Sequence, residues 1–310
     1  MVGPGRAGAW LATVLLAAAP AQACQWVRRA EVPVRVIEGF PIVPAEIGGM
    51  PVSMLLDTGA QGHLVLPEAA SSLGLRGVPG RTVRVFGTGG ARDVAAVMLQ
   101  GLALGGAAVP ALMTPVIALP GVPRTAPALA GILGAPLLAA YDLDLDVPGG
   151  RIGLYDGRDC GATPPPIGPR MTILALDVTP EGEAFLPVRV NGENLLALLD
   201  TGARATLITE RAARRLGLGA PISANTARGV DGEALPLQHV RAREMQVGND
   251  LRLDVPISIA PLQLGRGDML LGLDYLGQRR VWVSYATGRV AIALPDGLPG
   301  AAPSPAPSGR

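Results

Sequence analysis

The sequence lacks lysine and contains only two histidines, two cysteines and ten aromatic residues in 310 positions. Its 26 basic residues are therefore all arginines, and 25 acidic residues balance them to a formal charge of +1. Because so small a net charge creates no field that would attract a polyanion, we expect no nucleic-acid partner. His63 and His239 belong to no cluster of metal ligands, so we expect no metal and no other cofactor.

Several short enzyme motifs are also missing. The sequence contains no G-x-S-x-G for serine hydrolysis, and the glycine-rich run Gly87–Gly90 lacks the Lys-Ser/Thr that follows in a phosphate-binding loop. Asp142, Asp144 and Asp146 have the opening spacing of a calcium loop, but Val147 stands where that motif requires glycine. We therefore predict that this alternating segment is a strand with its leucines inward and its carboxylates outward.

What the chain does contain is apolar and turn-forming residues. Apolar residues make up 49% of it, and 42 glycines with 30 prolines give 72 turn formers, which indicates a turn-rich globular protein. Short aliphatic segments bounded by Gly, Pro or Asn recur along the chain and predict strands. The clearest of them are Val52–Leu56, Val94–Leu99, Leu186–Val190 and Val281–Tyr285. The fold class is therefore all-β.

The first 23 residues are typical of a signal peptide. Arg6 gives a short positive region, Ala7–Ala19 is apolar but too short to span a bilayer, and Ala21–Ala23 is an A-x-A cleavage site. We expect an exported protein, periplasmic or secreted, whose mature chain begins at Cys24 and contains no transmembrane segment. Lipid attachment at Cys24 is the alternative to free export.

The two cysteines bracket the first half of the mature chain. Export would place Cys24 and Cys160 where disulfides persist, and a bridge between them would close a loop of about 137 residues, worth up to ~5 kcal/mol. The alternative is two separate buried thiols. Residues 161–172, with three consecutive prolines, are predicted to be a linker, and residues 296–310 to be a disordered tail.

Comparison of the sequence with itself reveals an internal duplication. Residues 57–75 and 200–218 share ten identities in nineteen positions without a gap, at an offset of 143 residues. Later segments correspond at an offset of 138, among them Gly150–Ile152 and Gly288–Val290. We predict two homologous domains, at residues 24–160 and 173–295, because a repeat of this length is too long for a solenoid unit.

One short helix is expected in each copy, directly after the repeated motif. Pro67 suits the first turn of one helix and Thr209 the N-cap of the other. Gly74 and Gly217 stand where each helix would end in a left-handed residue.

The repeated motif is Asp-Thr-Gly-Ala, at 57–60 and 200–203, each time after an aliphatic strand. An ionised carboxylate is costly at the end of a buried strand unless it accepts hydrogen bonds or shares a proton. The following glycine permits a tight turn and a close approach by another group. If the two copies pack about a pseudo-twofold axis, Asp57 and Asp200 meet and hold one proton between them.

These two motifs resemble those of aspartic peptidases of the retropepsin and pepsin superfamily. Each is followed some seventy residues later by two aliphatic residues and a glycine, and the likeness covers nearly all of residues 31–295. In more detail, the sequence resembles a bacterial exported retropepsin-like protein with both lobes in one chain. It implies two retropepsin-like β-barrel lobes in a pepsin-like pseudo-twofold arrangement. It also implies that Asp57 and Asp200 activate a water that attacks a peptide bond.

The resemblance assigns supporting roles position by position. Thr58 and Thr201 would brace each catalytic turn against the other, and further support would come from Gly59, Ala60, Gly202, Ala203, Gly134 and Gly272. The substrate-binding flaps would include Phe86, Gly87, Thr88, Gly89 and Gly90 in the first copy and Gly229, Val230, Asp231 and Gly232 in the second.

Two departures from the family pattern have consequences. The first copy has Ala135-Pro136 where the second has the more typical Leu273-Asp274, which indicates divergence of the first lobe. Both motifs place alanine where pepsin-like enzymes usually have a hydroxyl donor to the carboxylates. Fewer donors to the charged form raise the dyad's pKa values, so we predict a weakly acidic to neutral pH optimum.

The predicted function is that of an aspartic endopeptidase, acting on a peptide or protein substrate as a monomer with an internal pseudo-dimer. Retention of both aspartates favours hydrolysis over the main alternative, a non-catalytic exported peptide-binding or scaffold protein with the same fold. A homodimer with active sites between chains is the other alternative.

Overall fold

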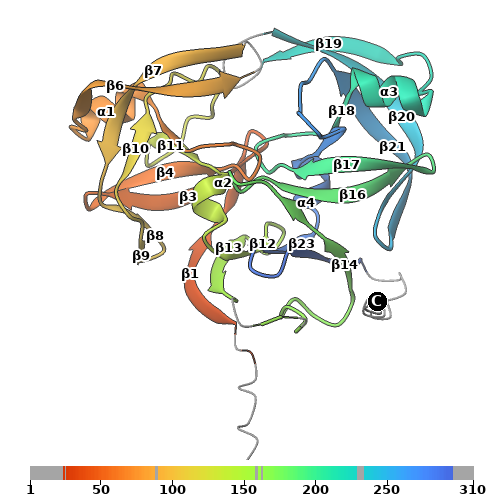
Figure 1. The fold of residues 1–310 in the computed structure, drawn as a ribbon, viewed down its shortest axis with the longest axis horizontal. Helices are drawn as coiled ribbons and strands as arrows, with labels where there is room; N and C mark the ends of the chain where they lie inside the picture. Colours follow the sequence, from red (N-terminus) through yellow and green to blue (C-terminus); the bar gives the residue numbers. More distant parts are fainter. Residues whose placement is uncertain are drawn as a thin grey trace, which may run out of the picture.

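The structure is a computed structural model, and it describes residues 24, 26–87, 90–157, 160–161, 163–228 and 234–295. The predicted signal peptide and the predicted tail at 296–310 lie outside these residues. The described chain is almost entirely strand and forms two barrel-like lobes side by side, the first drawn in red to yellow and the second in green to blue (Figure 1). Aliphatic residues from both lobes form one large buried core.

The first lobe contains thirteen described strands: β1 Val27–Pro33, β2 Arg35–Ile37, β3 Phe40–Ile47, β4 Met50–Leu56, β5 Leu64–Val65, β6 Gly77–Gly87, β7 Gly90–Leu99, β8 Leu102–Leu104, β9 Ala107–Ala108, β10 Leu112–Pro115, β11 Leu129–Leu133, β12 Asp142–Asp146 and β13 Arg151–Asp156. The described strands of the second lobe are β14 Met171–Ala175, β15 Asp177–Val178, β16 Ala184–Val190, β17 Glu193–Leu199, β18 Leu207–Thr209, β19 Ser223–Arg228, β20 Ala234–Val247, β21 Asp250–Ala260, β22 Met269–Leu271, β23 Arg280–Ser284 and β24 Arg289–Ala293.

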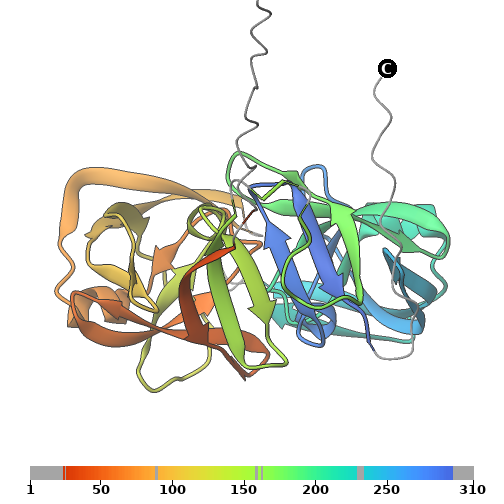
Figure 2. The same ribbon diagram turned by 90° about the horizontal axis from the view of Figure 1, so that it is seen from below.

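A six-stranded sheet joins the two lobes. Its order is β1-β13-β12-β23-β24-β14, so three strands from each lobe meet at the β12–β23 pair. Seen from below, this sheet lies across the boundary between the lobes (Figure 2). The strands β12 and β23 occupy equivalent places in the duplication and pair antiparallel, with Asp144 opposite Trp282. These two residues are 138 apart, the offset of the repeat here, so the pseudo-twofold axis passes between them.

The prediction that the carboxylates of β12 face outward is wrong. Asp142, Asp144 and Asp146 are 2%, 3% and 7% exposed, because β12 lies in the middle of the shared sheet. Arg280 donates two hydrogen bonds to Asp144, of 2.8 and 2.7 Å. Ser284 donates to Asp142 at 2.8 Å. Asp142 and Asp144 are buried because β23, from the other lobe, supplies their partners, whereas Asp146 pairs mainly with Arg151 of its own lobe.

Each lobe has two short helices rather than the single one predicted. The expected helices are α1 Pro67–Ser72, with proline in its first turn, and α3 Glu210–Leu216, where the Thr209 hydroxyl accepts from a backbone N–H at 3.2 Å. Gly74 and Gly217 have the predicted positive φ, of 61° and 56°. The additional helices, α2 Ala135–Leu138 and α4 Leu273–Leu276, are single turns that lack a periodic apolar pattern.

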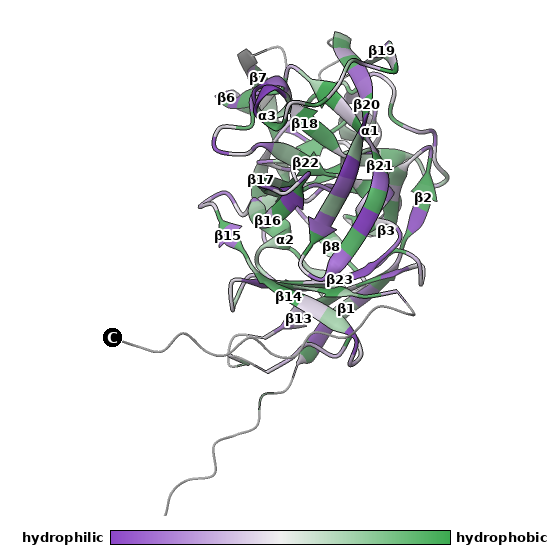
Figure 3. Ribbon diagram, turned by 90° about the vertical axis from the view of Figure 1, so that its right-hand side faces the viewer, coloured by the Kyte–Doolittle hydropathy of each residue, from purple (hydrophilic) through white to green (hydrophobic). Residues whose placement is uncertain are grey.

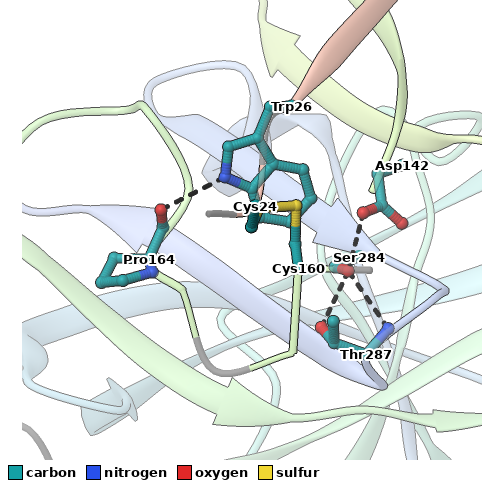
Figure 4. The surroundings of a disulfide bond; sticks show 7 residues. All are labelled: Cys24, Trp26, Asp142, Cys160, Pro164, Ser284 and Thr287. Carbon is teal, nitrogen blue, oxygen red and sulfur yellow. Dashed lines mark hydrogen bonds between the residues drawn. A yellow bond between two sulfur atoms is a disulfide. The ribbon is translucent and has the colours of Figure 1, made fainter. Parts of the chain in front are cut away.

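The predicted disulfide between Cys24 and Cys160 is present, with Cα atoms 4.6 Å apart. It ties the residues before β1 to the connection between the lobes (Figure 4). Beside it, Trp26 donates from Nε1 to the carbonyl of Pro164 at 3.4 Å and packs edge-on against Trp282, with ring centroids 4.9 Å apart. The disulfide therefore anchors a contact among the N-terminal segment, the connection and β23.

The long strands β20 and β21 show alternating hydropathy in Figure 3. In β21 the burial does not follow this alternation, because Asp250 is buried whereas Leu251 and Leu253 are exposed. Within the described part of the chain, no helix has the length and apolar character needed to cross a membrane. Opposite the shared sheet, the hairpin β6–β7 and strand β19 lie at the top of the molecule in Figure 1.

Candidate active site

The two Asp-Thr-Gly-Ala turns lie where β4 and β17 end, at the boundary between the lobes (Figure 1). Both strands pair in parallel with a second buried strand, β4 with β11 and β17 with β22. The backbone N–H of Asp57 donates to Leu133 at 3.0 Å, and that of Asp200 donates to Leu271 at 3.1 Å. The same local pairing therefore positions both aspartates.

The aspartates face each other across the lobe boundary, each against the glycine of the opposite turn. A Cβ atom added to Gly59 would lie 2.5 Å from Cγ of Asp200. A Cβ atom added to Gly202 would collide with the carboxylate of Asp57. Glycine is required at both positions because any side chain would fill the space that the opposite carboxylate occupies.

Thr58 and Thr201 link the two turns through four buried hydrogen bonds. The hydroxyl of Thr58 donates to the carbonyl of Leu199 at 2.7 Å and accepts from the N–H of Thr201 at 3.0 Å. The hydroxyl of Thr201 donates to Leu56 at 2.7 Å and accepts from the N–H of Thr58 at 3.1 Å. Because these contacts are reciprocal, they fix the distance between the two aspartate backbones.

The carboxylates accept backbone hydrogen bonds within their own turns. Asp57 accepts from Gly59 at 3.0 Å, and Asp200 accepts from Gly202 at 2.9 Å and from Ala203 at 3.0 Å. Asp57 is only 8% exposed, and burial raises its pKa above the usual value. Burial also raises the pKa of Asp200, and the neighbouring charge of Asp57 raises it well above the usual range. The ionisation of each carboxyl group therefore disfavours the ionisation of the other.

Gly134 and Gly272 lie directly beneath the two turns. A Cβ atom on Gly134 would lie 3.0 Å from the carbonyl oxygen of Ala60 and would collide with that of Gly62. A Cβ atom on Gly272 would lie 2.6 Å from the carbonyl oxygen of Ala205. These glycines let α2 and α4 approach the turns closely, as the resemblance implied.

The bracing around the two turns differs between the lobes. In the second lobe, the Thr206 hydroxyl donates to Asp274 at 2.8 Å and accepts from the N–H of Gly272 at 3.3 Å. The corresponding residues of the first lobe are His63 and Pro136. Nδ1 of His63 is buried and has no hydrogen-bond partner, and burial lowers the pKa of this imidazole.

The flap predictions are only partly within the described residues. In the first copy, β6 and β7 form a hairpin in which Phe86 pairs with Ala91 and Gly87 with Gly90. Thr88 and Gly89 lie outside the described residues, as do Gly229, Val230, Asp231 and Gly232. Strands β19 and β20 form the corresponding hairpin of the second copy. The flap roles stay predictions.

His239 lies on the stem of this second hairpin. One ring nitrogen lies 2.9 Å from the Ser258 hydroxyl and the other 3.0 Å from the side-chain oxygen of Asn225. These bonds tie three adjacent strands together. Among the described residues, no three or more His, Cys, Asp or Glu side chains form a group that could hold a metal ion.

Residues beyond the motif also meet across the lobes, and the sequence analysis did not identify them. Gln61 donates from Nε2 to Glu183 at 3.3 Å, and the guanidinium of Arg204 lies 4.2 Å from the ring centroid of Phe40. Each contact joins the residue four positions after an aspartate to a residue of the other lobe. An alignment of the two copies pairs the neutral Gln61 with the charged Arg204, and the neutral Phe40 with the charged Glu183. This difference in charge could have been found from the sequence.

Comparison with protein-family models gives one match in each lobe. Residues 43–137 match the model described as aspartyl protease, and residues 186–278 match the model described as gag-polyprotein putative aspartyl protease. Both matched segments contain an Asp-Thr-Gly-Ala turn and the glycine beneath it. Together with the two barrel-like lobes, the matches identify the fold as two retropepsin-like β-barrels and support a retropepsin-like aspartic protease.

Two curated relatives each match about a third of the chain. DNA damage-inducible protein 1 of Yarrowia lipolytica is 29% identical over 111 residues, which is 35% of this chain and 27% of that protein. The protein of the same name from Chaetomium globosum is 31% identical over 111 residues, 35% of this chain and 24% of that protein. The chain thus spans about a quarter of the length of these relatives. Among solved structures, basic 7S globulin from soybean is similar with a TM-score of 0.48 and 13% identity, over 87% of this chain and 95% of that one.

Proposed function

We propose that this chain is an aspartic endopeptidase that hydrolyses peptide bonds with a water molecule held between Asp57 and Asp200. The observation that carries this proposal is the reciprocal hydrogen bonding of Thr58 and Thr201, which brings two identical turns together with their carboxyl groups facing each other. The two matches to aspartyl protease models support it.

The chemistry follows from one shared proton. The ionised carboxylate takes a proton from the water as the water oxygen bonds to the peptide carbonyl carbon. The protonated carboxyl group supplies the proton that the amide nitrogen receives when the C–N bond breaks. No covalent bond to the protein forms. The threonine contacts hold the two carboxyl groups at a fixed separation throughout.

The first experiment replaces each aspartate in turn. Asp57→Asn and Asp200→Asn each remove one of the two proton-transfer groups, and we expect each to lower kcat on an unstructured peptide by roughly 10²–10⁴-fold. Asp254→Asn is the control, because Asp254 is an exposed residue paired with Arg241. Equal cleavage by the wild type and both dyad variants would contradict the mechanism. Peptide binding without cleavage by the wild type would instead favour the non-catalytic binding protein.

The second experiment measures the pH dependence of cleavage. Burial raises the pKa of both Asp57 and Asp200, and Ala60 and Ala203 offer the carboxylates no hydroxyl donor. We expect activity to peak at weakly acidic to neutral pH. A peak near pH ~2, well below the usual carboxyl pKa, would contradict this assignment.

The proposal includes export and a monomeric active form. The Cys24–Cys160 disulfide is compatible with an oxidising compartment, and one chain already supplies both aspartates. Cell fractionation and N-terminal sequencing of the mature protein test export and the cleavage site. Sedimentation that gives only dimers, with activity lost on dilution, would favour the homodimeric alternative.

A further inference from the structure

The two copies differ in charge at two pairs of equivalent positions beside the aspartates. Gln61 and Arg204 each stand four residues after an aspartate and are both exposed. Their partners in the opposite lobe, Glu183 and Phe40, are also equivalent, being 143 residues apart in the duplication. The pseudo-twofold axis therefore relates a Gln–Glu contact on one side of the dyad to an Arg–Phe contact on the other.

On one side, Glu183 is a buried carboxylate without a cation. It is 9% exposed, and its hydrogen-bond donors among the described residues are neutral groups, Gln61 at 3.3 Å and the Thr179 hydroxyl at 3.5 Å. In the described part of the chain, no basic side chain lies within 4.0 Å of it, and Arg266 acts on it only from a longer range, while Glu181 adds a second negative charge. A buried carboxylate is costly unless a cation pairs with it.

On the other side, Arg204 is a cation without a carboxylate. Its guanidinium stacks over the half-buried ring of Phe40 at 4.2 Å, and its stem packs against Gly39, where an added Cβ atom would lie 3.1 Å from both Cγ and Cδ. None of the described carboxylates lies within ion-pair distance of it. The stacking holds the side chain in place and leaves the planar N–H groups able to bind an anion.

These opposite charges matter because the two Asp-Thr-Gly-Ala turns are nearly symmetric. An extended peptide that crosses the dyad would meet equivalent backbone groups in either direction, so unlike groups on the two sides must decide its orientation. We propose that Glu183 and Arg204 are specificity-determining residues: Glu183 binds a basic side chain on one side of the scissile bond, and Arg204 binds an acidic side chain on the other. This inference rests on the proposed function and names its substrate class.

The test uses two peptides with the same neutral residues around the scissile bond. One carries an arginine before the bond and a glutamate after it, at equal distances, and the other carries the same two residues exchanged. We expect the wild type to cleave one of them with a kcat/KM at least about tenfold higher, and the ratio to fall with added salt. Glu183→Gln and Arg204→Gln should each reduce the ratio, and the double variant Glu183→Arg/Arg204→Glu should invert it.

Matched controls separate recognition from folding. Glu183→Gln keeps an acceptor for Gln61 and for Thr179, so its melting temperature should stay close to that of the wild type. Glu210→Gln and Arg214→Gln, which remove an exposed i,i+4 pair on α3, should leave the ratio unchanged. Equal cleavage of both peptides by the wild type, or an unchanged ratio in the exchanged double variant, would overturn the inference.

The outcome can be separated from that of the proposed function. Cleavage of an uncharged peptide without any preference between the charged ones would overturn this inference alone and leave the peptidase standing. Fluorescence anisotropy with labelled peptides and Asp57→Asn measures binding without turnover. A preference in binding that Glu183→Gln removes would support the inference even if no peptide were cleaved.

Discussion

The two lobes carry the same turn, but their surroundings have diverged. Two contacts that cross the axis are the same in both copies: the paired threonines and the glycine that faces the opposite carboxylate. Contacts that stay within one lobe have changed. Thr206 and Asp274 form a hydrogen-bonded brace behind the second turn, whereas His63 and Pro136 occupy those positions in the first.

The difference has a physical reason. A residue on the axis contacts its own counterpart, so a change in either copy leaves both without a partner. A residue behind the turn contacts only its own lobe. A substitution there therefore changes the contacts of that lobe alone and leaves the other lobe unaffected. The strands β12 and β23, which pair across the axis, show a third outcome: β12 supplies the buried Asp142 and Asp144, and β23 supplies the hydroxyl and the arginine that pair with them.

The largest expected effect comes from breaking this unlike pair on the axis. Arg280→Met leaves Asp144 buried without its two hydrogen bonds, which should lower the free energy of unfolding by about 3–5 kcal/mol. Urea denaturation measures it. Arg151→Met, which removes a more exposed partner of Asp146, is the control and should cost about 1 kcal/mol or less. Combining Arg280→Met with Asp144→Leu should recover much of the loss, and no recovery would contradict the pairing.

The second prediction tests the symmetry of the threonine contacts. Thr58→Ala and Thr201→Ala each leave a buried carbonyl and a buried N–H without partners, so each should cost about 2–4 kcal/mol. The two losses should be equal, and the double variant should lose less than their sum because the hydroxyls belong to one network. Serine at either position keeps the hydroxyl and is the control. Clearly unequal losses on denaturation would show that one lobe dominates the contact.

The third prediction compares the residues that lie behind the two turns, Thr206 in the second lobe and His63 in the first. Thr206→Val removes the partner of Asp274 and of the Gly272 N–H, so it should lower the free energy of unfolding by about 1–3 kcal/mol. His63→Val removes no hydrogen bond made by Nδ1 and should cost less than Thr206→Val by about 1 kcal/mol or more. Denaturation curves of both variants give the comparison. Equal losses would mean that the braces are equivalent after all.

The smallest expected effect is a pH dependence of stability. In the unfolded chain both dyad carboxyls ionise at the usual pKa of about 4, whereas burial raises their pKa in the folded protein. The folded protein therefore binds more protons between these values, and its stability falls as the pH rises through them. Asp57→Asn removes this cost and should be more stable than the wild type by about 0.5–2 kcal/mol at neutral pH.

Denaturation of wild type and Asp57→Asn between about pH 4 and pH 8 measures that difference, which should grow with pH. Asp254→Asn should instead be less stable than the wild type above the usual carboxyl pKa. The hydrogen bond from Arg241 lowers the pKa of Asp254, so the ionised form stabilises the folded protein. A difference that shrinks with rising pH for Asp57→Asn would show that the dyad is not buried as a pair.

Much of the fold could be predicted because the sequence repeats itself. The strands before each motif, the cap at Thr209 and the left-handed glycines after α1 and α3 are local features with a clear residue signature. The single-turn helices α2 and α4 lack such a signature. Their position depends on the close contact between Gly134 or Gly272 and the turn above it.

The two aspartates of the candidate site could be predicted from the sequence, but the contacts of the charged residues beside them could not. Asp57 and Asp200 carry a motif that is repeated in register, so sequence comparison alone brings them together. Glu183 and Arg204 carry no motif. Each becomes notable only because the other lobe places Gln61 or Phe40 beside it, and the residues of each contact are far apart in the chain.

The sequence by itself determined the duplication, the strand-rich fold and the identity of the two facing aspartates, since each is written in residue order and spacing. The tertiary structure alone decided the burial of the β12 carboxylates, the unequal bracing of the turns and the contacts of Glu183 and Arg204 beside the dyad. These depend on which side chain of one lobe meets which side chain of the other. Period-two alternation assigns a residue to one face of a strand, but only packing determines whether that face meets water or a partner.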